Sequence, residues 1–305
     1  MTSMQDRLRP SIAAALHEIA VECTENRYGC WRVRLGGDFE LTATLDNEWL
    51  QLCAPFARGR IHGGAIPRCA WEVLLRNSQL PGAAKLVTAP DREVVHAALE
   101  IFLDIEAMPT PPTNDASVNP LKSQLAISID HLKEATRRHP NRDQLADCRG
   151  TVSRAADLPA LCTDAGWTST SRDGGRVVVQ LETAHGFAQA ALTWNDDLKV
   201  AVKLHRGERS LPALSRQAIA VMLLRLGGSV RAIRPAVFTE SDHNVFILQA
   251  NVGPNPTARA LDHVLAAFSV AAGMCQSELA LLSDEQISSL YLSARGWSAS
   301  SQVPV

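Results

Sequence analysis

The segment LDNEWLQLCA at residues 45–54 recurs later in the chain as TWNDDLKVAV at residues 193–202. Both segments place a turn of Asn and acidic residues between two apolar runs, and they lie 148 residues apart. Apolar runs on either side of a short polar turn predict a β-hairpin. Two such hairpins at this distance in a chain of 305 residues indicate an internal duplication.

Three further pairs of segments support the duplication because they follow in the same order. WEVLLR at 71–76 matches AVMLLR at 220–225, DREVV at 91–95 matches DHNVF at 242–246, and NP at 119–120 matches NP at 255–256. The offset between partners changes only by loop-sized steps. We therefore predict two copies of one domain, at residues 1–140 and 151–305, joined by a linker at 141–150.

The periodicity of apolar residues predicts the order α-β-β-β-α-β-β-α in each copy. Hairpin-length connections between the first three strands predict an antiparallel sheet with its helices packed mainly on one face, an α+β fold. In the first copy the apolar stripe of the first helix runs from Ile12 to Cys23, and Pro120 begins the last helix. In the second copy the last long helix is expected to open at Asn255-Pro256.

Composition and charge narrow the class of protein. Apolar residues make up 46 % of the chain and charged residues 20 %, which is typical of a globular protein. A net charge of −2 without a basic tail argues against nucleic acid as a partner. The most apolar stretch, residues 261–282, contains charged residues, which favours a core helix over a membrane span. Seven cysteines without a CxxC pair predict buried thiols in a reducing cytoplasm.

No motif for catalysis, cofactor binding or metal binding stands out. The sequence lacks GxSxG, HExxH, Walker and CxxC patterns, and its Gly-Gly pairs do not form GxGxxG. Asp196 and Asp197 match Asn47 and Glu48 in the other copy, so we interpret them as solvated turn acids rather than a metal pair. We therefore assign no catalytic residue, cofactor or metal ligand.

One strand face differs between the copies. At a constant offset of 148, the polar positions Glu40, Thr42, Thr44 and Asp46 correspond to Ala188, Ala190, Leu192 and Trp194. A one-residue slip in register would exchange the two faces and is one explanation. The other is that the second copy buries this face against its sister domain, a second chain or a client. On the second explanation the partner-binding residues are Trp49, Ala190, Leu192 and Trp194.

A family resemblance rests on the segment LLRN at residues 74–77 and the segment LVTAPDREVV at 86–95. A helix ending in Leu-Leu near an Asn, followed by a strand, an Asp-centred turn and another strand, resembles type III secretion chaperones and the related YbjN-like fold. The second copy keeps LLR at 223–225 but lacks the Asn. The resemblance implies a protein that holds a partly unfolded effector segment. Family members are typically small acidic homodimers, whereas this chain is a nearly neutral tandem.

Three functional hypotheses follow. The first is a non-enzymatic binding protein whose two copies form an intramolecular pseudo-dimer that holds an extended client segment. The second is a structural or regulatory protein that self-associates, for example as a homodimer, without a client. The third is an enzyme with a site between the copies, built from residues such as His62, His185 or Asp91.

Overall fold

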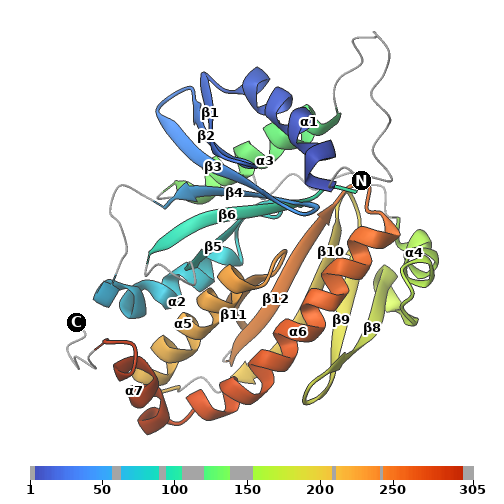
Figure 1. The fold of residues 1–305 in the computed structure, drawn as a ribbon. Coiled ribbons are helices and arrows are strands. Elements are labelled where there is room, and N and C mark those ends of the chain that lie inside the picture. Colours follow the sequence, from blue (N-terminus) through green and yellow to red (C-terminus); the bar gives the residue numbers. More distant parts are fainter. Residues whose placement is uncertain are drawn as a thin grey trace.

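The computed structural model describes residues 4–56, 63–88, 94–104, 120–137, 154–207, 211–240 and 243–297. These residues form two antiparallel six-stranded sheets with their helices, so the α+β fold predicted from the sequence is confirmed (Figure 1).

The described part of the first copy contains one sheet and three α-helices. Its strand order across the sheet is β1-β2-β3-β4-β6-β5, and every neighbouring pair is antiparallel. The elements are α1 (Met4–Ile19), β1 (Glu22–Arg27), β2 (Cys30–Leu35), β3 (Phe39–Asp46), β4 (Trp49–Pro55), α2 (Ile66–Asn77), β5 (Lys85–Thr88), β6 (Val95–Phe102) and α3 (Pro120–Thr136).

The second copy repeats this plan and adds a final helix. Its sheet has the order β7-β8-β9-β10-β12-β11, which is the same path through the strands as in the first copy. The elements are α4 (Leu158–Asp164), β7 (Ser169–Arg172), β8 (Arg176–Thr183), β9 (Gly186–Trp194), β10 (Leu198–Gly207), α5 (Ala213–Ser229), β11 (Arg234–Glu240), β12 (His243–Gly253), α6 (Ala258–Leu282) and α7 (Glu285–Ser293).

Each copy has one strand more than the sequence predicted. β1 and β7 are polar, largely exposed strands at the outer edges of the two sheets, so they lack the apolar alternation that identifies a half-buried strand. The observed order is α-β-β-β-β-α-β-β-α in both copies. Cys23, which the sequence placed on the first helix, lies in β1.

The start of the last long helix also differs from the prediction. α6 begins at Ala258 rather than at Asn255-Pro256, and Thr257 is its N-cap. The Thr257 hydroxyl accepts a hydrogen bond from the backbone N–H of Ala260 at 3.2 Å. A separate helix, α7, follows, and its N-cap Asp284 accepts hydrogen bonds from the N–H groups of Gln286 and Ile287.

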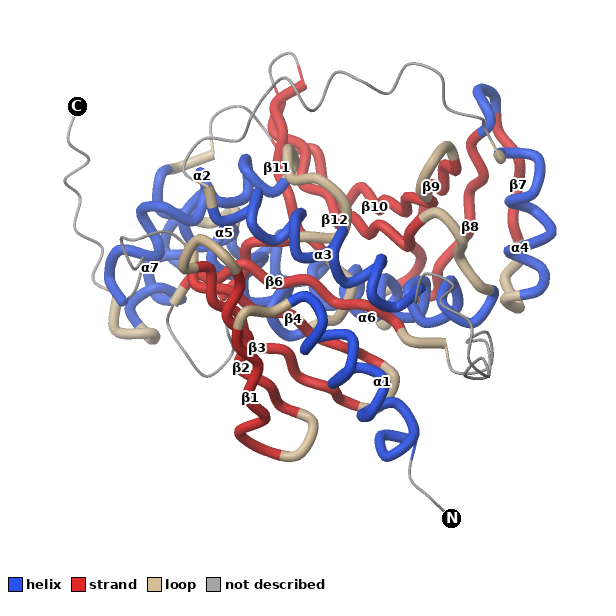
Figure 2. Tube along the Cα trace, turned by 90° about the horizontal axis from the view of Figure 1, so that it is seen from above, coloured by secondary structure: helices blue, strands red, loops and turns tan. Residues whose placement is uncertain are grey.

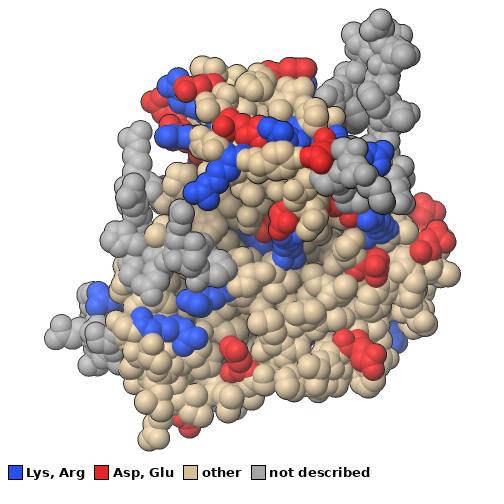
Figure 3. Space-filling model, in the orientation of Figure 1, with Lys and Arg blue, Asp and Glu red and all other residues tan. Residues whose placement is uncertain are grey.

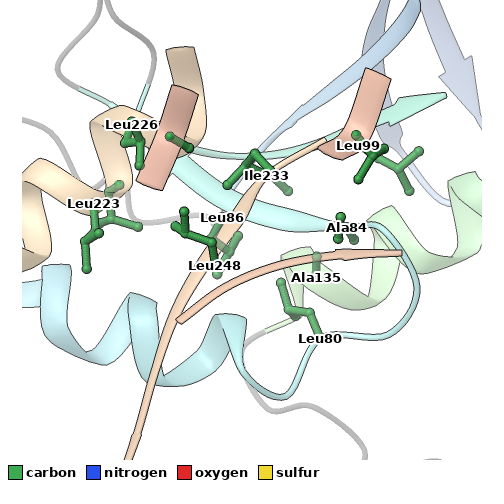
Figure 4. Packing of buried hydrophobic residues seen from close by; sticks show 14 of the residues in the cluster. Leu80, Ala84, Leu86, Leu99, Ala135, Leu223, Leu226, Ile233 and Leu248 are labelled. Carbon is green, nitrogen blue, oxygen red and sulfur yellow. The ribbon is translucent and has the colours of Figure 1, made fainter. Parts of the chain in front are cut away.

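The two copies share one hydrophobic core at their junction. α2 packs on α5 and on β11 of the second copy, while α5 packs on β5 of the first copy. Trp71 on α2 meets Phe246 on β12 edge to face, with 5.8 Å between ring centroids. Figure 4 shows Leu223, Leu226, Ile233 and Leu248 of the second copy beside apolar residues of the first copy, Leu80, Ala84, Leu86, Leu99 and Ala135. Each copy therefore covers part of the other copy's sheet.

The outer edges of the sheets lie away from this junction. β7 and α4 stand at the end of the molecule opposite to α2, α5 and α7 (Figure 2). The inner face of the second sheet is covered by α6, which crosses it diagonally, and by α4 (Figure 1). Its other face carries none of these helices.

Candidate functional site

Three of the four predicted partner-binding residues belong to the core. Ala190 and Leu192 are 0 % exposed and Trp194 is 7 % exposed, on the face of β9 that α4 and α6 cover. The prediction of a partner surface on these residues is wrong. The cause is the length of the hairpin turn: Leu45 pairs with Leu50, whereas Trp194 pairs with Leu198 across a turn that is one residue shorter.

This shorter turn changes the offset between the copies. Before the turn the correct offset is 149, so Leu45 corresponds to Trp194, and both are buried. The polar outward positions of β3 then correspond to outward positions of β9 rather than to its core positions. The one-residue slip is therefore the correct explanation for the difference between the strand faces. The matched outward residues are Gln189, Ala191 and Thr193.

The fourth predicted residue, Trp49, lies at the junction between the copies. Its ring is half-buried and stands 5.2 Å from the Phe102 ring and 6.5 Å from the ring of His263 on α6, between centroids. Next to it, Arg259 on α6 donates a hydrogen bond to Glu48 Oε2 at 2.6 Å. Trp49 thus contacts the sister copy within the same chain.

Two cations at equivalent positions bind across the junction. Lys85 is the first residue of β5 and Arg234 is the first residue of β11. Lys85 Nζ lies 2.6 Å from the carbonyl oxygen of Gly227 and 3.2 Å from that of Val230, both in the second copy. Lys85 Nζ also forms a buried ion pair with Glu100 Oε2 at 2.8 Å. The Lys85 charge is therefore held by groups from both copies.

Arg234 makes the reciprocal contacts. Its Nη1 lies within 3.0 Å of the carbonyl oxygens of Leu80, Gly82 and Ala84, in the loop that joins α2 to β5 of the first copy. Burial lowers the pKa of Arg234 to about 10. Each cation thus binds backbone carbonyls of the other copy, and the two sets of contacts are related by a pseudo-twofold axis, as expected for an isologous contact between two copies of one domain.

Asn77, the Asn of the LLRN segment, ties the edges of the two sheets together. Its fully buried amide donates hydrogen bonds to the carbonyl oxygens of Leu86 on β5 and Pro235 on β11, both at 2.9 Å. Its carbonyl oxygen accepts from the Leu86 N–H at 2.7 Å. One side chain therefore occupies hydrogen-bonding groups of both inner edge strands, and the polar groups at this point serve the packing of the copies.

Cys53 is a half-buried cysteine beside this junction. Cys53 lies on β4 next to β6, and burial, followed by the charge of Glu100, raises its pKa to about 12. A thiol with such a pKa stays protonated, and the thiolate is the reactive form. The raised pKa therefore leaves Cys53 in its less reactive thiol form at neutral pH.

The open face of the second sheet contains a groove. Its floor is a row of small side chains on three adjacent strands, because Val178 pairs with Ala191 and Ala191 pairs with Ala201. The hollow has a volume of about 690 Å³. Ala188, Val202 and Leu204, together with Ala272 and Gln276 of α6, line it from the other side of the sheet. Its flanks include Phe187, Phe238, Ile247, Gln189, Gln249, Arg176, Lys199 and Lys203. This volume lies within the usual range for binding pockets.

The groove has an apolar end and a cationic end. At one end, Lys199 on β10 pairs with Thr193 on β9. Arg176 on β8 lies opposite Thr193 on its other side, because the next residue, Val177, pairs with Leu192. Near the other end, Phe238 pairs with Val245. No carboxylate is found among the described residues that line the groove. The hollow therefore combines an apolar floor with cations at one end.

The open face of the first sheet has a different character. At the offset of 149, Thr42 corresponds to Ala191. Arg32 pairs with Thr42 and Val178 pairs with Ala191, so Arg32 and Val178 occupy equivalent positions. On the first sheet Arg32 forms an ion pair with Glu40 at 2.9 Å, and Arg34 forms one with Glu22 at 2.6 Å. The cations of this face are thus neutralised by carboxylates of neighbouring strands, and the face is polar rather than apolar.

A second exposed surface lies on the helices of the second copy. Val270, Met274 and Leu281 face outward along α6, and Ile287 and Leu290 do so on α7. In Figure 3 charges of both signs mix over the upper part of the molecule, while the lower part, where α6 runs, is largely uncharged. Among the described helices α6 alone meets the length and apolar composition of a membrane span, and 44 % of its apolar window is buried in the fold.

Of the three residues named for an inter-copy enzyme site, one lies within the described residues. His62 and Asp91 lie outside the described residues, and His185 is exposed in the turn between β8 and β9. Within the described ranges no group of three His, Cys, Asp or Glu side chains is placed to hold a metal ion.

The chain was compared with family models, curated proteins and solved structures. No family model, curated protein or solved structure matches this chain. The groove residues Val178, Ala191 and Ala201 were also missed by the sequence analysis, although an offset of 149 before the hairpin turn would have identified the outward face of β9.

Proposed function

We propose that this protein is a non-enzymatic binding protein that holds an extended segment of a protein client. The observation that carries the proposal is the groove on the open face of the second sheet, with Val178, Ala191 and Ala201 as its floor. An open apolar groove with polar flanks suits a peptide, whose side chains reach the floor while its backbone stays near water. The resemblance to type III secretion chaperones favours the same activity, with the two copies acting as an intramolecular pseudo-dimer.

The scaffold supports this proposal because it holds the groove on rigid elements. The three floor residues lie on neighbouring strands of one sheet, whose other face packs on α6. Reciprocal contacts of Lys85 and Arg234 fix the second sheet to the first copy. A binding site built on a sheet requires little ordering when the client arrives, which favours affinity.

A groove-filling substitution tests this function. Ala191→Phe places a large ring over the floor, and Thr42→Phe makes a matched change at the equivalent position of the first sheet. Each variant and the unmodified protein serve as bait in extracts of the source cell. We expect one or more proteins to co-purify with the unmodified chain and with Thr42→Phe but not with Ala191→Phe. Equal recovery with all three would contradict a client site in this groove.

A second function, self-association without a client, is favoured by the apolar outward residues of α6 and α7. Val270, Met274 and Leu290 are each exposed by about half or more. Aligned apolar residues on neighbouring helices are typical of helix-mediated dimers. Light scattering after size exclusion separates the two functions. A dimer that Met274→Glu converts into a monomer supports self-association, and a monomer at all concentrations excludes it.

A further inference from the structure

The charge of the groove distinguishes it from the rest of the two sheet faces. On the first sheet the outward cations Arg32 and Arg34 have carboxylate partners on adjacent strands. On the second sheet the equivalents of Arg32 and Glu40 are the uncharged residues Val178 and Gln189. The cations Arg176 and Lys199 have no carboxylate partner among the described residues.

The position of these cations adds to the contrast. Arg176 is the first residue of β8 and Lys199 is the second residue of β10, and Thr193 of β9 lies between them. Both side chains are exposed, so they are hydrated and available to an incoming group. Directly beside them lies the small apolar floor of Val178, Ala191 and Ala201. An occupant with negative charge at one end and apolar side chains next to it would complement both features.

We infer that the client segment bound in this groove is acidic as well as apolar: its carboxylates meet Arg176 and Lys199 while its apolar side chains cover the floor. This inference rests on the proposed function and specifies the chemistry of the client. Complementary charge of this kind steers association and selects among partners more than it adds raw affinity. A fully apolar segment would leave the two cations partly desolvated without a partner, at a cost in binding free energy.

The shape of the groove favours a peptide over a small anion or a lipid. The floor spans three strands and has two cations at one end, whereas a lipid chain carries no charge along its length to meet them. A small anion would contact the cationic end without using the floor. A peptide in extended conformation places alternate side chains on the same side, which lets apolar residues face the sheet while flanking acids reach the rim.

Three labelled peptides of equal length test the inference on the full chain. The first has Leu and Val at alternate positions separated by Ser, followed by Asp and Glu at one end. The second replaces the acids by Lys, and the third keeps the acids and replaces Leu and Val by Ser. Binding is followed by fluorescence anisotropy. We expect the first peptide to bind, the second and third to bind at least about tenfold more weakly, and binding of the first to weaken as salt rises.

Charge reversal locates the contact. Arg176→Glu combined with Lys199→Glu should lower the affinity for the acidic apolar peptide by about tenfold or more and raise the affinity for the Lys peptide. Arg216→Glu, an exposed change on α5 away from the groove, is the matched control and should leave both affinities unchanged. All three variant positions are exposed, so circular dichroism should show an unchanged fold. Unchanged binding of the acidic peptide to the doubly reversed protein overturns the inference.

The outcomes separate this inference from the proposed function. If Ala191→Phe abolishes client capture while the charge-reversed protein still captures the client, the groove binds a client but the client is not selected by its acids. If neither change affects capture, both the proposed function and the inference fail. If both changes abolish capture and only the acidic apolar peptide binds, both stand.

Discussion

Lys85 and Arg234 occupy the same position in the two sheets, and each inserts its cation among backbone carbonyls of the other copy. Lys85 Nζ lies 2.6 Å from the Gly227 carbonyl oxygen, and Arg234 Nη1 lies 3.0 Å from that of Gly82. This exchange joins two domain copies into one folded unit. It also explains why neither cation needs a solvent-exposed carboxylate.

Removing the Lys85 charge should strongly destabilise the protein. Lys85→Met leaves Glu100 buried without its ion-pair partner, and breaking such a buried pair costs about 3–5 kcal/mol. The free energy of unfolding in urea measures this cost. Lys122→Met, which removes an exposed ion pair with Glu18, is the control and should cost less than about 1 kcal/mol. The double change Lys85→Met with Glu100→Leu should recover part of the lost free energy of unfolding. Equal losses for Lys85→Met and for the control Lys122→Met would contradict a buried ion pair at Lys85.

Gly227 should tolerate no side chain, although it lies within a helix. A Cβ there would stand 2.6 Å from Pro235 Cδ and 2.9 Å from Val87 Cγ1. Helix propensity alone would favour Ala over Gly by about 1 kcal/mol, so destabilisation by Gly227→Ala isolates the steric cost. Thermal unfolding should show a lower Tm for Gly227→Ala, whereas Gly36→Ala, with open space around its Cβ, should change Tm little. A raised Tm for Gly227→Ala would show that the two copies do not pack this closely.

Acid should weaken the fold through His131. Burial lowers the pKa of His131, Arg234 lowers it further, and Asp197 and Asp130 oppose the shift. Because the folded-state pKa lies below the unfolded value of 6.5, the unfolded state binds the proton first as pH falls. The stabilising effect of the neutral ring is therefore present above pH 6.5 and is lost as pH falls through the folded-state pKa. Urea unfolding of His131→Gln should vary less between pH 7.5 and 5 than unfolding of the unmodified protein; parallel pH profiles would contradict this.

The two copies should unfold together. Leu45 of the first copy and Leu192 of the second belong to the same core cluster, and α2 and α5 each cover a strand of the other copy. Differential scanning calorimetry should show a single transition, and Leu45→Ala and Leu192→Ala should each shift all of it to lower temperature. Two transitions, each moved by only one of these substitutions, would show that the copies are independent domains.

The sequence predicted the repeated plan because hairpins and helix stripes leave local signals. The hairpin with its turn after Trp194 was recognisable without tertiary information. The same holds for the helices that contain LLR at 74–76 and 223–225. The edge strands β1 and β7 were not, because exposed polar strands carry no apolar alternation. Their stability comes from pairing with β2 and β8.

The candidate site depended on a detail that a constant offset hides. The turn before Leu198 is one residue shorter than its counterpart, so a constant offset assigns the wrong face to the strand before it. Ala190, Leu192 and Trp194 were therefore predicted on the surface, although they lie in the core. The groove became visible only when the pairing of Ala191 with Ala201 was known. Likewise, nothing local to Lys85 or Arg234 shows that each binds backbone carbonyls more than 140 residues away in the chain.

Site-specific photo-crosslinking tests the groove most directly. A benzoylphenylalanine at Gln189, on the flank of the groove, is compared with one at Thr42 on the open face of the first sheet, each with the biotinylated acidic apolar peptide. We predict a one-to-one adduct from position 189, suppressed by excess unlabelled peptide, and none from position 42. Adducts of equal yield from both positions, or an adduct from position 42 alone, would contradict binding in the groove of the second sheet.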